Sequence, residues 1–142
     1  MFQQLFGRRL VVLCCPENEM LRCTNAILVV EDNALIRFLI CDLLESAGFV
    51  ALQAEGAFAA VQILEGRTDV GLVVTDVAMP HRSDGITLVS TIREKWPLVK
   101  VVVTIGHATV DQRELPDDAR VFIKPFDDKA LVEAAEELLQ AA

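Results

Sequence analysis

The chain has 142 residues and is 53% apolar, which is enough to bury the core of one domain and is atypical of a disordered protein. Its formal net charge of -8 argues against direct nucleic-acid binding, because phosphate contacts need clustered Lys and Arg side chains. No apolar run approaches the roughly 20 residues that a membrane-spanning helix needs, so we expect a soluble protein that does not contact the membrane. We expect its location to be the cytoplasm.

The first 25 residues do not share the regular pattern of the rest of the chain. We predict an N-terminal extension over residues 1–25 and a single domain over residues 26–142. Three interpretations of the extension stay open: a disordered tail, an over-long start before Met20, or a segment at Leu10–Cys15 that forms an added strand or a homodimer contact. The cysteines lack metal-ligand spacing and are interpreted as reduced thiols. They are Cys14, Cys15, Cys23 and Cys41.

A regular alternation of apolar strands and amphipathic helices begins at Ala26. The elements predicted in this half are a buried strand over 26–30, a helix over about 34–47, a short strand over 49–54 and a helix over 57–66. Glu31 and Asp32 directly follow the first strand, and Gly48 ends the first helix. The short second strand ends without a candidate site residue.

The strongest strand pattern lies in the second half of the chain. Residues 70–76 form a continuous apolar run, typical of a central parallel strand buried on both faces, and this run stops at Asp76. The elements predicted after it are a loop over 79–85, a helix that Pro97 stops, a strand over 99–104, a loop with at most a short helix over 106–118, a strand over 119–124 and an amphipathic closing helix. This alternation predicts an α/β fold with a mainly parallel sheet between layers of helices.

Polar side chains of complementary chemistry stand at four of the predicted strand ends. They are Glu31 and Asp32, then Asp76, Thr104 and Lys124. Ligands bind outside the carboxyl ends of strands in open α/β sheets. If the first and third strands are neighbours, three carboxylates converge, and each pair at about 4 Å costs about 1 kcal/mol in water and about 4 kcal/mol at an effective dielectric constant of 20. A proton or a cation must relieve this repulsion.

An all-oxygen ligand set favours a hard divalent cation, and few protein ligands with room for water and phosphate oxygens favour Mg2+. The lone His81 and His107 argue against zinc. A carboxylate beside Mg2+ can attack phosphorus, while Lys and Thr side chains neutralise the phosphoryl oxygens or hydrogen-bond to them. No Gly-x-x-x-x-Gly-Lys loop is present, so the expected donor is another protein's phosphohistidine or a small phosphodonor.

Each of these residues also has a simpler structural interpretation. Asp32 or Asn33 could cap a helix, and Asp76 could begin a turn. Thr104 could close a strand, and Lys124 could be solvated. Taken together, four strand ends with complementary chemistry favour a functional site over four unrelated coincidences.

Four segments resemble the receiver domain of two-component response regulators, which has the CheY-like fold. They are Val29-Val30-Glu31-Asp32-Asn33, Thr75-Asp76-Val77-Ala78-Met79-Pro80, Val103-Thr104 and Lys124-Pro125-Phe126. The similarity runs in the family's order from about Ile27 to the end of the chain. It implies a flavodoxin-like, doubly wound sheet of five parallel strands in the order 2-1-3-4-5, within a three-layer α/β/α sandwich.

The resemblance also implies roles for the site residues. Asp76 would be the phosphoacceptor, and Mg2+ would be held by Asp32, Asp76 and the backbone carbonyl of Ala78, with Glu31 acting through a metal-bound water. Thr104 would engage the phosphoryl group after transfer. Lys124 would pair with the phosphoryl oxygens, and its peptide bond to the following proline would be cis.

Several positions depart from the family's usual pattern. Val121 stands three positions before the lysine, where the family usually has Tyr or Phe, so the usual coupling of the Thr to an aromatic side chain cannot operate. Ile105 is bulkier than the usual residue and could narrow access to the phosphoryl pocket. Ala78 and Gly106 are small, so we expect weak shielding of the phosphoryl group from water.

Three functional classes remain under comparison. The first is a stand-alone receiver that accepts a phosphoryl group from a sensor histidine kinase or histidine phosphotransferase and acts by phosphorelay or by docking an unknown downstream protein; it is a regulatory phosphoacceptor and not an enzyme. The second is a phosphorylation-independent pseudo-receiver adaptor, whose usual mark is loss of the acids or the lysine. The third is a haloacid-dehalogenase-like phosphatase, which normally has a second Asp where this chain has Ala78.

Overall fold

The computed structural model describes residues 26–77, 82–106 and 119–140. In chain order the elements are β1 (Ala26–Val30), α1 (Ala34–Ser46), β2 (Val50–Ala54), α2 (Ala57–Gly66), β3 (Val70–Asp76), α3 (Arg82–Lys95), β4 (Lys100–Ile105), β5 (Arg120–Ile123) and α4 (Asp128–Gln140). The predictions for residues 1–25, and nearly all of the predicted loop over 106–118, lie outside the described residues. Among those described, no helix is both long and apolar enough to cross a bilayer.

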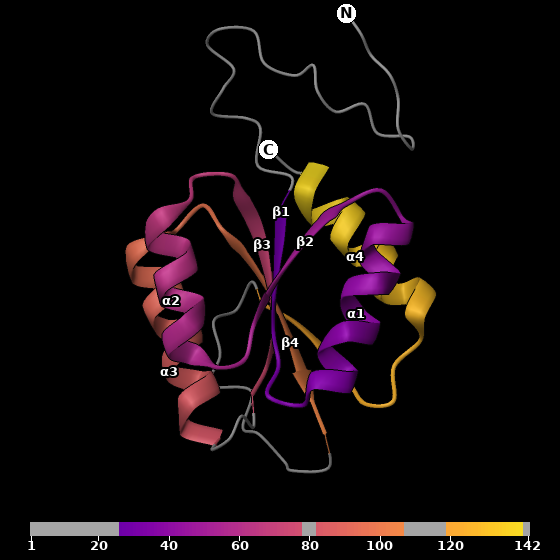
Figure 1. Cartoon of the computed structure of the whole chain (residues 1–142), viewed down its shortest axis with the longest axis horizontal. Helices are drawn as coiled ribbons and strands as arrows, with labels where there is room; N and C mark the ends of the chain where they lie inside the picture. The colour runs from indigo at the N-terminus through magenta and orange to yellow at the C-terminus, as the bar shows by residue number, and fades with distance from the viewer. Residues whose placement is uncertain (1–25, 78–81, 107–118, 141–142) are drawn as a thin grey trace, which may run out of the picture.

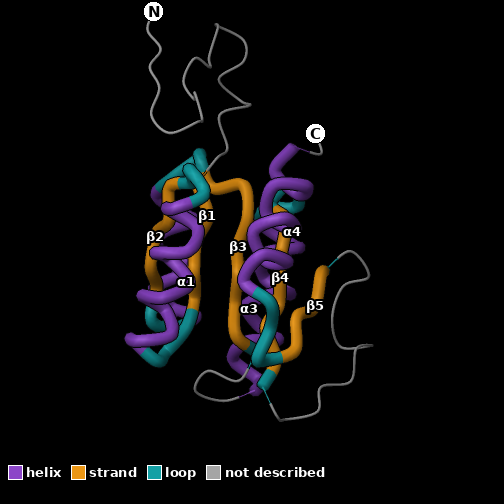
Figure 2. Tube along the Cα trace, turned by 90° about the vertical axis from the view of Figure 1, so that its right-hand side faces the viewer, coloured by secondary structure: helices purple, strands orange, loops and turns teal. Residues whose placement is uncertain are grey.

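The five strands form one parallel sheet in the order β2-β1-β3-β4-β5 (Figure 2). Helices α1 and α4 cover one face of the sheet, and α2 and α3 cover the other (Figure 1). This arrangement confirms the predicted flavodoxin-like sandwich. It also places β1 beside β3 and β3 beside β4, so the strand ends with candidate site residues are neighbours.

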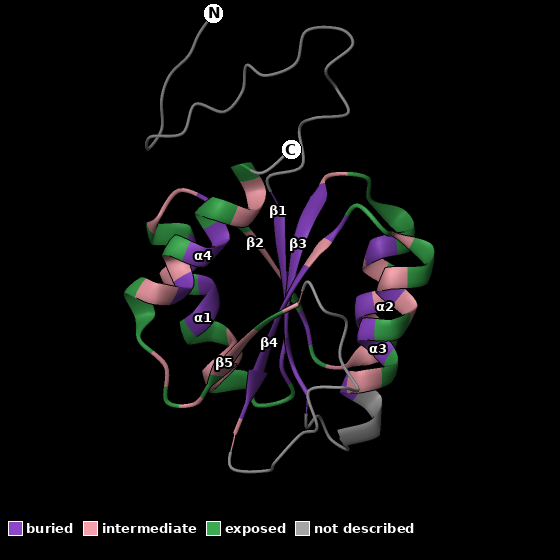
Figure 3. Ribbon diagram, turned by 180° about the vertical axis from the view of Figure 1, so that it is seen from behind, coloured by how far each residue is buried: buried purple, intermediate pink, exposed green. Residues whose placement is uncertain are grey.

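The core consists of two apolar layers on either side of the sheet. Alternate residues of β1 enter different layers: Leu28 packs on the α2 and α3 side, and Ile27 packs on the α1 and α4 side. Every residue of β1 and β3 is buried (Figure 3). Because fully burying one such side chain contributes about 1.5–3 kcal/mol, these two strands are firmly anchored up to their polar ends.

Helix α3 begins earlier than the sequence pattern predicts. The loop was expected to continue to Gly85, but the helix starts at Arg82, so this boundary was wrong. Gly85 lies inside the helix, directly against the backbone of Val77, and a side chain there would overlap it. Gly85 therefore allows α3 to pack closely against the backbone of Val77, and it does not break the helix.

Helix α1 ends as predicted but buries fewer of its apolar residues than its pattern suggests. Gly48 follows it with a φ of 99°, a left-handed conformation that favours glycine. Ile40, Cys41 and Leu44 are buried. A second set of large apolar side chains on the helix is exposed: Leu35, Phe38 and Leu39.

Candidate functional site

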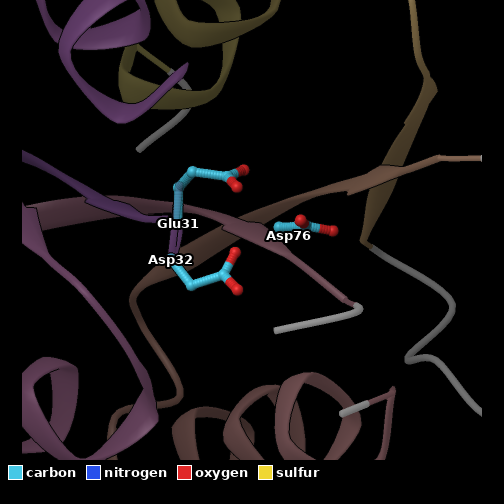
Figure 4. Close-up of side chains that lie close together, drawn as sticks. All are labelled: Glu31, Asp32 and Asp76. Carbon is cyan, nitrogen blue, oxygen red and sulfur yellow. The ribbon is translucent and has the colours of Figure 1, made fainter. Parts of the chain in front are cut away.

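Three carboxylates meet where β1 and β3 end. Glu31 and Asp32 directly follow β1, Asp76 is the last residue of β3, and the two strands are paired up to Val30 and Thr75. Each of the three acids offers one carboxylate oxygen, and these oxygens lie within 4.8 Å of one another (Figure 4). We call Glu31, Asp32 and Asp76 the acidic cluster.

The carboxyl ends of β4 and β5 complete the site. Thr104 pairs with Asp76 across the β3–β4 register and is buried, and its Oγ1 donates to the carbonyl oxygen of Thr75 at 3.5 Å. Lys124 follows β5, and its Nζ lies 3.3 Å from Glu31 Oε1 and 3.2 Å from Asp76 Oδ2. The structure thus brings together the predicted acids, hydroxyl and ammonium, whereas Ala78 lies outside the described residues.

The electrostatics of Glu31 reflect its burial among like charges. Desolvation raises the pKa of Glu31 above its ordinary value of 4.5, and the neighbouring Asp76 raises it further. Lys124 and the backbone N–H of Asn33 act in the opposite direction without cancelling the effect. The pKa of Glu31 therefore stays raised although the ammonium of Lys124 lies beside its carboxylate.

This raised pKa predicts a pH-dependent stability. Because folded Glu31 binds its proton more tightly than the unfolded chain does, its stabilising contribution is complete below about pH 4.5 and declines as the pH rises through the raised pKa. Glu31→Gln should abolish this decline in the metal-free protein. The free energy of urea unfolding, measured for both proteins from acidic to neutral pH, should therefore shift increasingly in favour of the variant. A difference that is constant with pH would contradict the prediction.

Several residues around the cluster were not predicted as site residues. Asn33 caps α1 by accepting bonds from the N–H groups of Leu35 and Ile36, which confirms the capping alternative for that residue. Arg37 donates to the carbonyl oxygen of Glu31 at 2.8 Å and to Gln53 Oε1 at 3.0 Å. The only sequence signals for this contact were an arginine in the apolar first half of α1 and a glutamine in an apolar strand.

β2 contributes more to the site than its sequence indicates. Besides the Gln53 side chain, it provides the carbonyl oxygen of Ala54, which accepts the N–H of Glu31 at 3.1 Å. Backbone acceptors leave no mark in a sequence. β2, for which no candidate site residue was predicted, therefore helps to hold the backbone of Glu31 in place.

The donor set fits a hard divalent cation. Three carboxylate oxygens are available within the described residues, and no histidine or cysteine joins the group. Cys41 is buried on α1, and burial raises the pKa of its thiol to about 11, so the thiol is protonated and unsuited to metal binding. This agrees with a reduced structural thiol at Cys41, while the other three cysteines lie outside the described residues.

Two further sequence expectations concern the fifth strand and the residue that follows it. The Lys124–Pro125 peptide bond is cis, as predicted. Val121 packs, half-buried, against the apolar layer on the α2 and α3 side. On the opposite face of the sheet, the rings of Phe122 and Phe126 pack edge to face with centroids 5.9 Å apart. The aromatic side chains flanking Lys124 thus lie on the face away from Val121.

Comparison with known proteins finds a matching family model and similar curated proteins. A family model described as response regulator receiver domain matches residues 27–136. The response regulator receiver protein CpdR of Brucella abortus is 34% identical over an alignment of 119 residues, and the match covers 82% of this chain and 97% of CpdR. The sensor kinase CckA of the same organism is 35% identical over 118 residues, covering 80% of this chain but only 12% of CckA.

Solved structures show the same fold. A response regulator receiver protein from Sinorhizobium medicae matches with a TM-score of 0.75 and 27% identity, over 82% of this chain and 94% of that protein. The receiver domain of NtrX from Brucella abortus matches with a TM-score of 0.72 and 29% identity, over 82% of this chain and 99% of that domain. The similarity thus spans both sequence and three-dimensional structure.

Proposed function

The chain belongs to the response regulator receiver family, and from this premise we propose that Asp76 accepts a phosphoryl group in a Mg2+-dependent reaction. The single observation that supports this most strongly is the acidic cluster with Lys124 at the shared carboxyl end of the sheet. The donor is the phosphohistidine of a sensor histidine kinase or of a histidine phosphotransferase.

The metal-binding residues in this proposal are Asp32, Asp76 and the backbone carbonyl of Ala78, with Glu31 acting through a bound water. Carboxylate oxygens and room for water are the ligands that Mg2+ prefers. When bound, Mg2+ supplies positive charge beside the transferring phosphoryl oxygens. Without it, a dianionic donor would approach three clustered carboxylates, and their repulsion would oppose the reaction.

The protein's own residues provide the remaining chemistry. A carboxylate oxygen of Asp76 attacks phosphorus in line with the departing imidazole nitrogen, so that the P–N bond breaks as the P–O bond forms. Lys124 already lies 3.2 Å from Asp76 Oδ2 and can pair with a phosphoryl oxygen. Thr104, which is paired with Asp76 in the sheet, can turn its hydroxyl from Thr75 toward the new phosphoryl group.

The relatives support a biological setting for this reaction. CpdR is a receiver protein of which this chain covers 97%, and CckA is a sensor kinase with a similar segment. These relatives support a histidine kinase partner and a stand-alone receiver. Such a receiver would act in the cytoplasm, by phosphorelay or by docking a downstream protein. The net charge of -8 supports a protein target over direct nucleic-acid contact.

Intact-mass spectrometry after incubation with a small phosphodonor tests the proposal. We expect one added phosphoryl group with Mg2+ present and none after chelation of divalent ions. Labelling that is independent of divalent ions would contradict the Mg2+ requirement. A complete lack of labelling would favour the phosphorylation-independent adaptor.

A protein donor should also depend on the exposed apolar residues of α1, Leu35, Phe38 and Leu39. These side chains are 56–67% exposed on the helix that begins three residues after Glu31. Exposed apolar groups beside a site are typical of protein contacts, and truncating a central aromatic anchor costs about 2 kcal/mol or more. We therefore expect Phe38→Ala to slow transfer from a phosphorylated histidine protein at least roughly 10-fold, without changing the rate with a small phosphodonor.

Phe58 provides a matched control for this measurement. It is 76% exposed on α2, on the opposite face of the sheet (Figure 1), so Phe58→Ala should leave both rates unchanged. Radiolabel transfer from the purified phosphohistidine protein measures the effect. Equal slowing by the two substitutions would argue against docking at α1.

A further inference from the structure

Arg37 links α1 to Glu31, which directly follows β1, and to Gln53 on β2. This half-buried side chain donates from Nη1 to the carbonyl oxygen of Glu31 at 2.8 Å and from Nε to Gln53 Oε1 at 3.0 Å. Neither bond involves a carboxylate of the acidic cluster. We propose that Arg37 is a positioning residue for Mg2+ binding, because it fixes the peptide unit that joins Glu31 to Asp32; this inference rests on the proposed function.

The geometry of that peptide unit determines where Asp32 points. The Glu31 carbonyl and the Asp32 N–H belong to one planar group, so holding the carbonyl sets the direction in which the chain enters Asp32. On the other side of Glu31, the N–H donates to the carbonyl oxygen of Ala54 at 3.1 Å, and the carboxylate accepts from Lys124 at 3.3 Å. With the Arg37 bond, the residue before Asp32 is held at its N–H, its side chain and its carbonyl.

Asp32 needs this support more than the other two acids. Glu31 and Asp76 are buried, whereas Asp32 is exposed and follows the last residue of β1 by two positions. Mg2+ demands nearly ideal octahedral geometry, so its affinity is sensitive to the placement of each ligand. A free Glu31 carbonyl would allow the peptide unit to rotate and Asp32 to sample directions away from the cluster.

The chemistry of arginine suits this position. The guanidinium is planar and always charged, and it presents several N–H donors in a fixed fork. Gln53 engages one of these donors and thereby orients the group, while Nη1 makes a charge-assisted bond to the carbonyl. A lysine has a single ammonium on a flexible stem and cannot reproduce both bonds in the same geometry.

Direct measurement of metal affinity tests the role of Arg37. Isothermal titration calorimetry with Mg2+ should show a dissociation constant about 10-fold higher for Arg37→Met than for the wild type, at the low end of the range for residues that support metal ligands. Arg37→Lys should give a smaller rise. In phosphorylation by a small phosphodonor, the half-saturating Mg2+ concentration should rise by the same factor, while the rate at saturating Mg2+ stays unchanged.

Arg93→Met is the matched control. Arg93 is a half-buried arginine whose Nη1 donates to the carbonyl oxygen of Val99 at 3.3 Å, with the same sequence separation of six residues. Val99 precedes β4 and therefore lies at the end of the sheet away from the acidic cluster. The control should leave Mg2+ affinity unchanged even where it lowers thermal stability, which separates positioning of the ligand from general support of the fold.

The possible outcomes distinguish this inference from the proposed function. If the wild-type protein binds no Mg2+, both the role of Arg37 and the proposed function are overturned. Wild-type protein that binds Mg2+, together with folded Arg37→Met of equal affinity, overturns only the role of Arg37. If circular dichroism shows that Arg37→Met does not fold, Gln53→Leu decides, because it removes only the exposed partner that orients the guanidinium. Unchanged Mg2+ affinity in Gln53→Leu would then refute the proposal, and a raised dissociation constant supports it.

Discussion

Replacing Asp76 by Asn is expected to reduce Mg2+-dependent phosphorylation to background while leaving the fold intact. The amide removes the anionic oxygen that attacks phosphorus and takes one oxygen-donating carboxylate from the acidic cluster. Asn has nearly the shape of Asp, and Asp76 is anchored by a strand that is buried over its whole length. The variant should therefore show a far-ultraviolet circular dichroism spectrum like that of the wild type.

Intact mass with a small phosphodonor and Mg2+ measures this effect. The wild type should gain one phosphoryl group, and Asp76→Asn should gain none under the same conditions. Asp69→Asn provides a matched control, because Asp69 is an acid paired with Arg67 before β3, at the other end of that strand. Equal labelling of wild type and Asp76→Asn would identify a different acceptor.

Gly85→Ala is expected to destabilise the protein by about 3 kcal/mol, near the upper end of the range for overpacked sites. A Cβ at this position would overlap the Val77 carbonyl oxygen and lie 2.6 Å from its carbonyl carbon. Both of these atoms belong to the backbone, so α3 and the segment around Val77 must move apart to make room for the methyl group. The usual gain of roughly 0.5–1 kcal/mol for replacing glycine by alanine inside a helix is too small to offset this cost.

The same substitution should also weaken the site. Val77 directly follows Asp76, and its N–H donates to the carbonyl oxygen of Thr104 at 3.1 Å, so displacing Val77 disturbs both neighbouring site residues. Urea unfolding measures the stability, and intact mass measures the reduced phosphorylation. Gly66→Ala is the control, since no heavy atom lies within 4 Å of a Cβ built there and the substitution should be neutral or stabilising. Equal stability of the two alanine variants would contradict the packing argument.

The sheet and the position of the site were predictable from the sequence because apolar runs end abruptly in polar residues. The run that forms β3 stops at Asp76, and the run that forms β1 stops at Glu31, so each strand marks its own carboxyl end. Parallel pairing then brings these ends together. The residues of the acidic cluster could therefore be named without any knowledge of the contacts between them.

Other features could not be predicted because they depend on partners that the sequence does not reveal. Gly85 resembles a helix breaker unless one knows that the backbone of Val77 lies against it. Leu35 and Leu39 fit the helical pattern of α1, yet both are exposed, since the apolar stripe is wider than the contact with the sheet. The bond from Arg37 ends on a backbone carbonyl, which every residue possesses.

The most direct measurement is a crystal structure of the protein with Mg2+ and beryllium fluoride, a stable mimic of the phosphoryl group. We expect the fluoride complex on the Asp76 carboxylate, Mg2+ beside it in contact with Asp32, and Lys124 turned toward a fluorine. An empty acidic cluster under these conditions, or a fluoride complex attached to another side chain, would contradict the account.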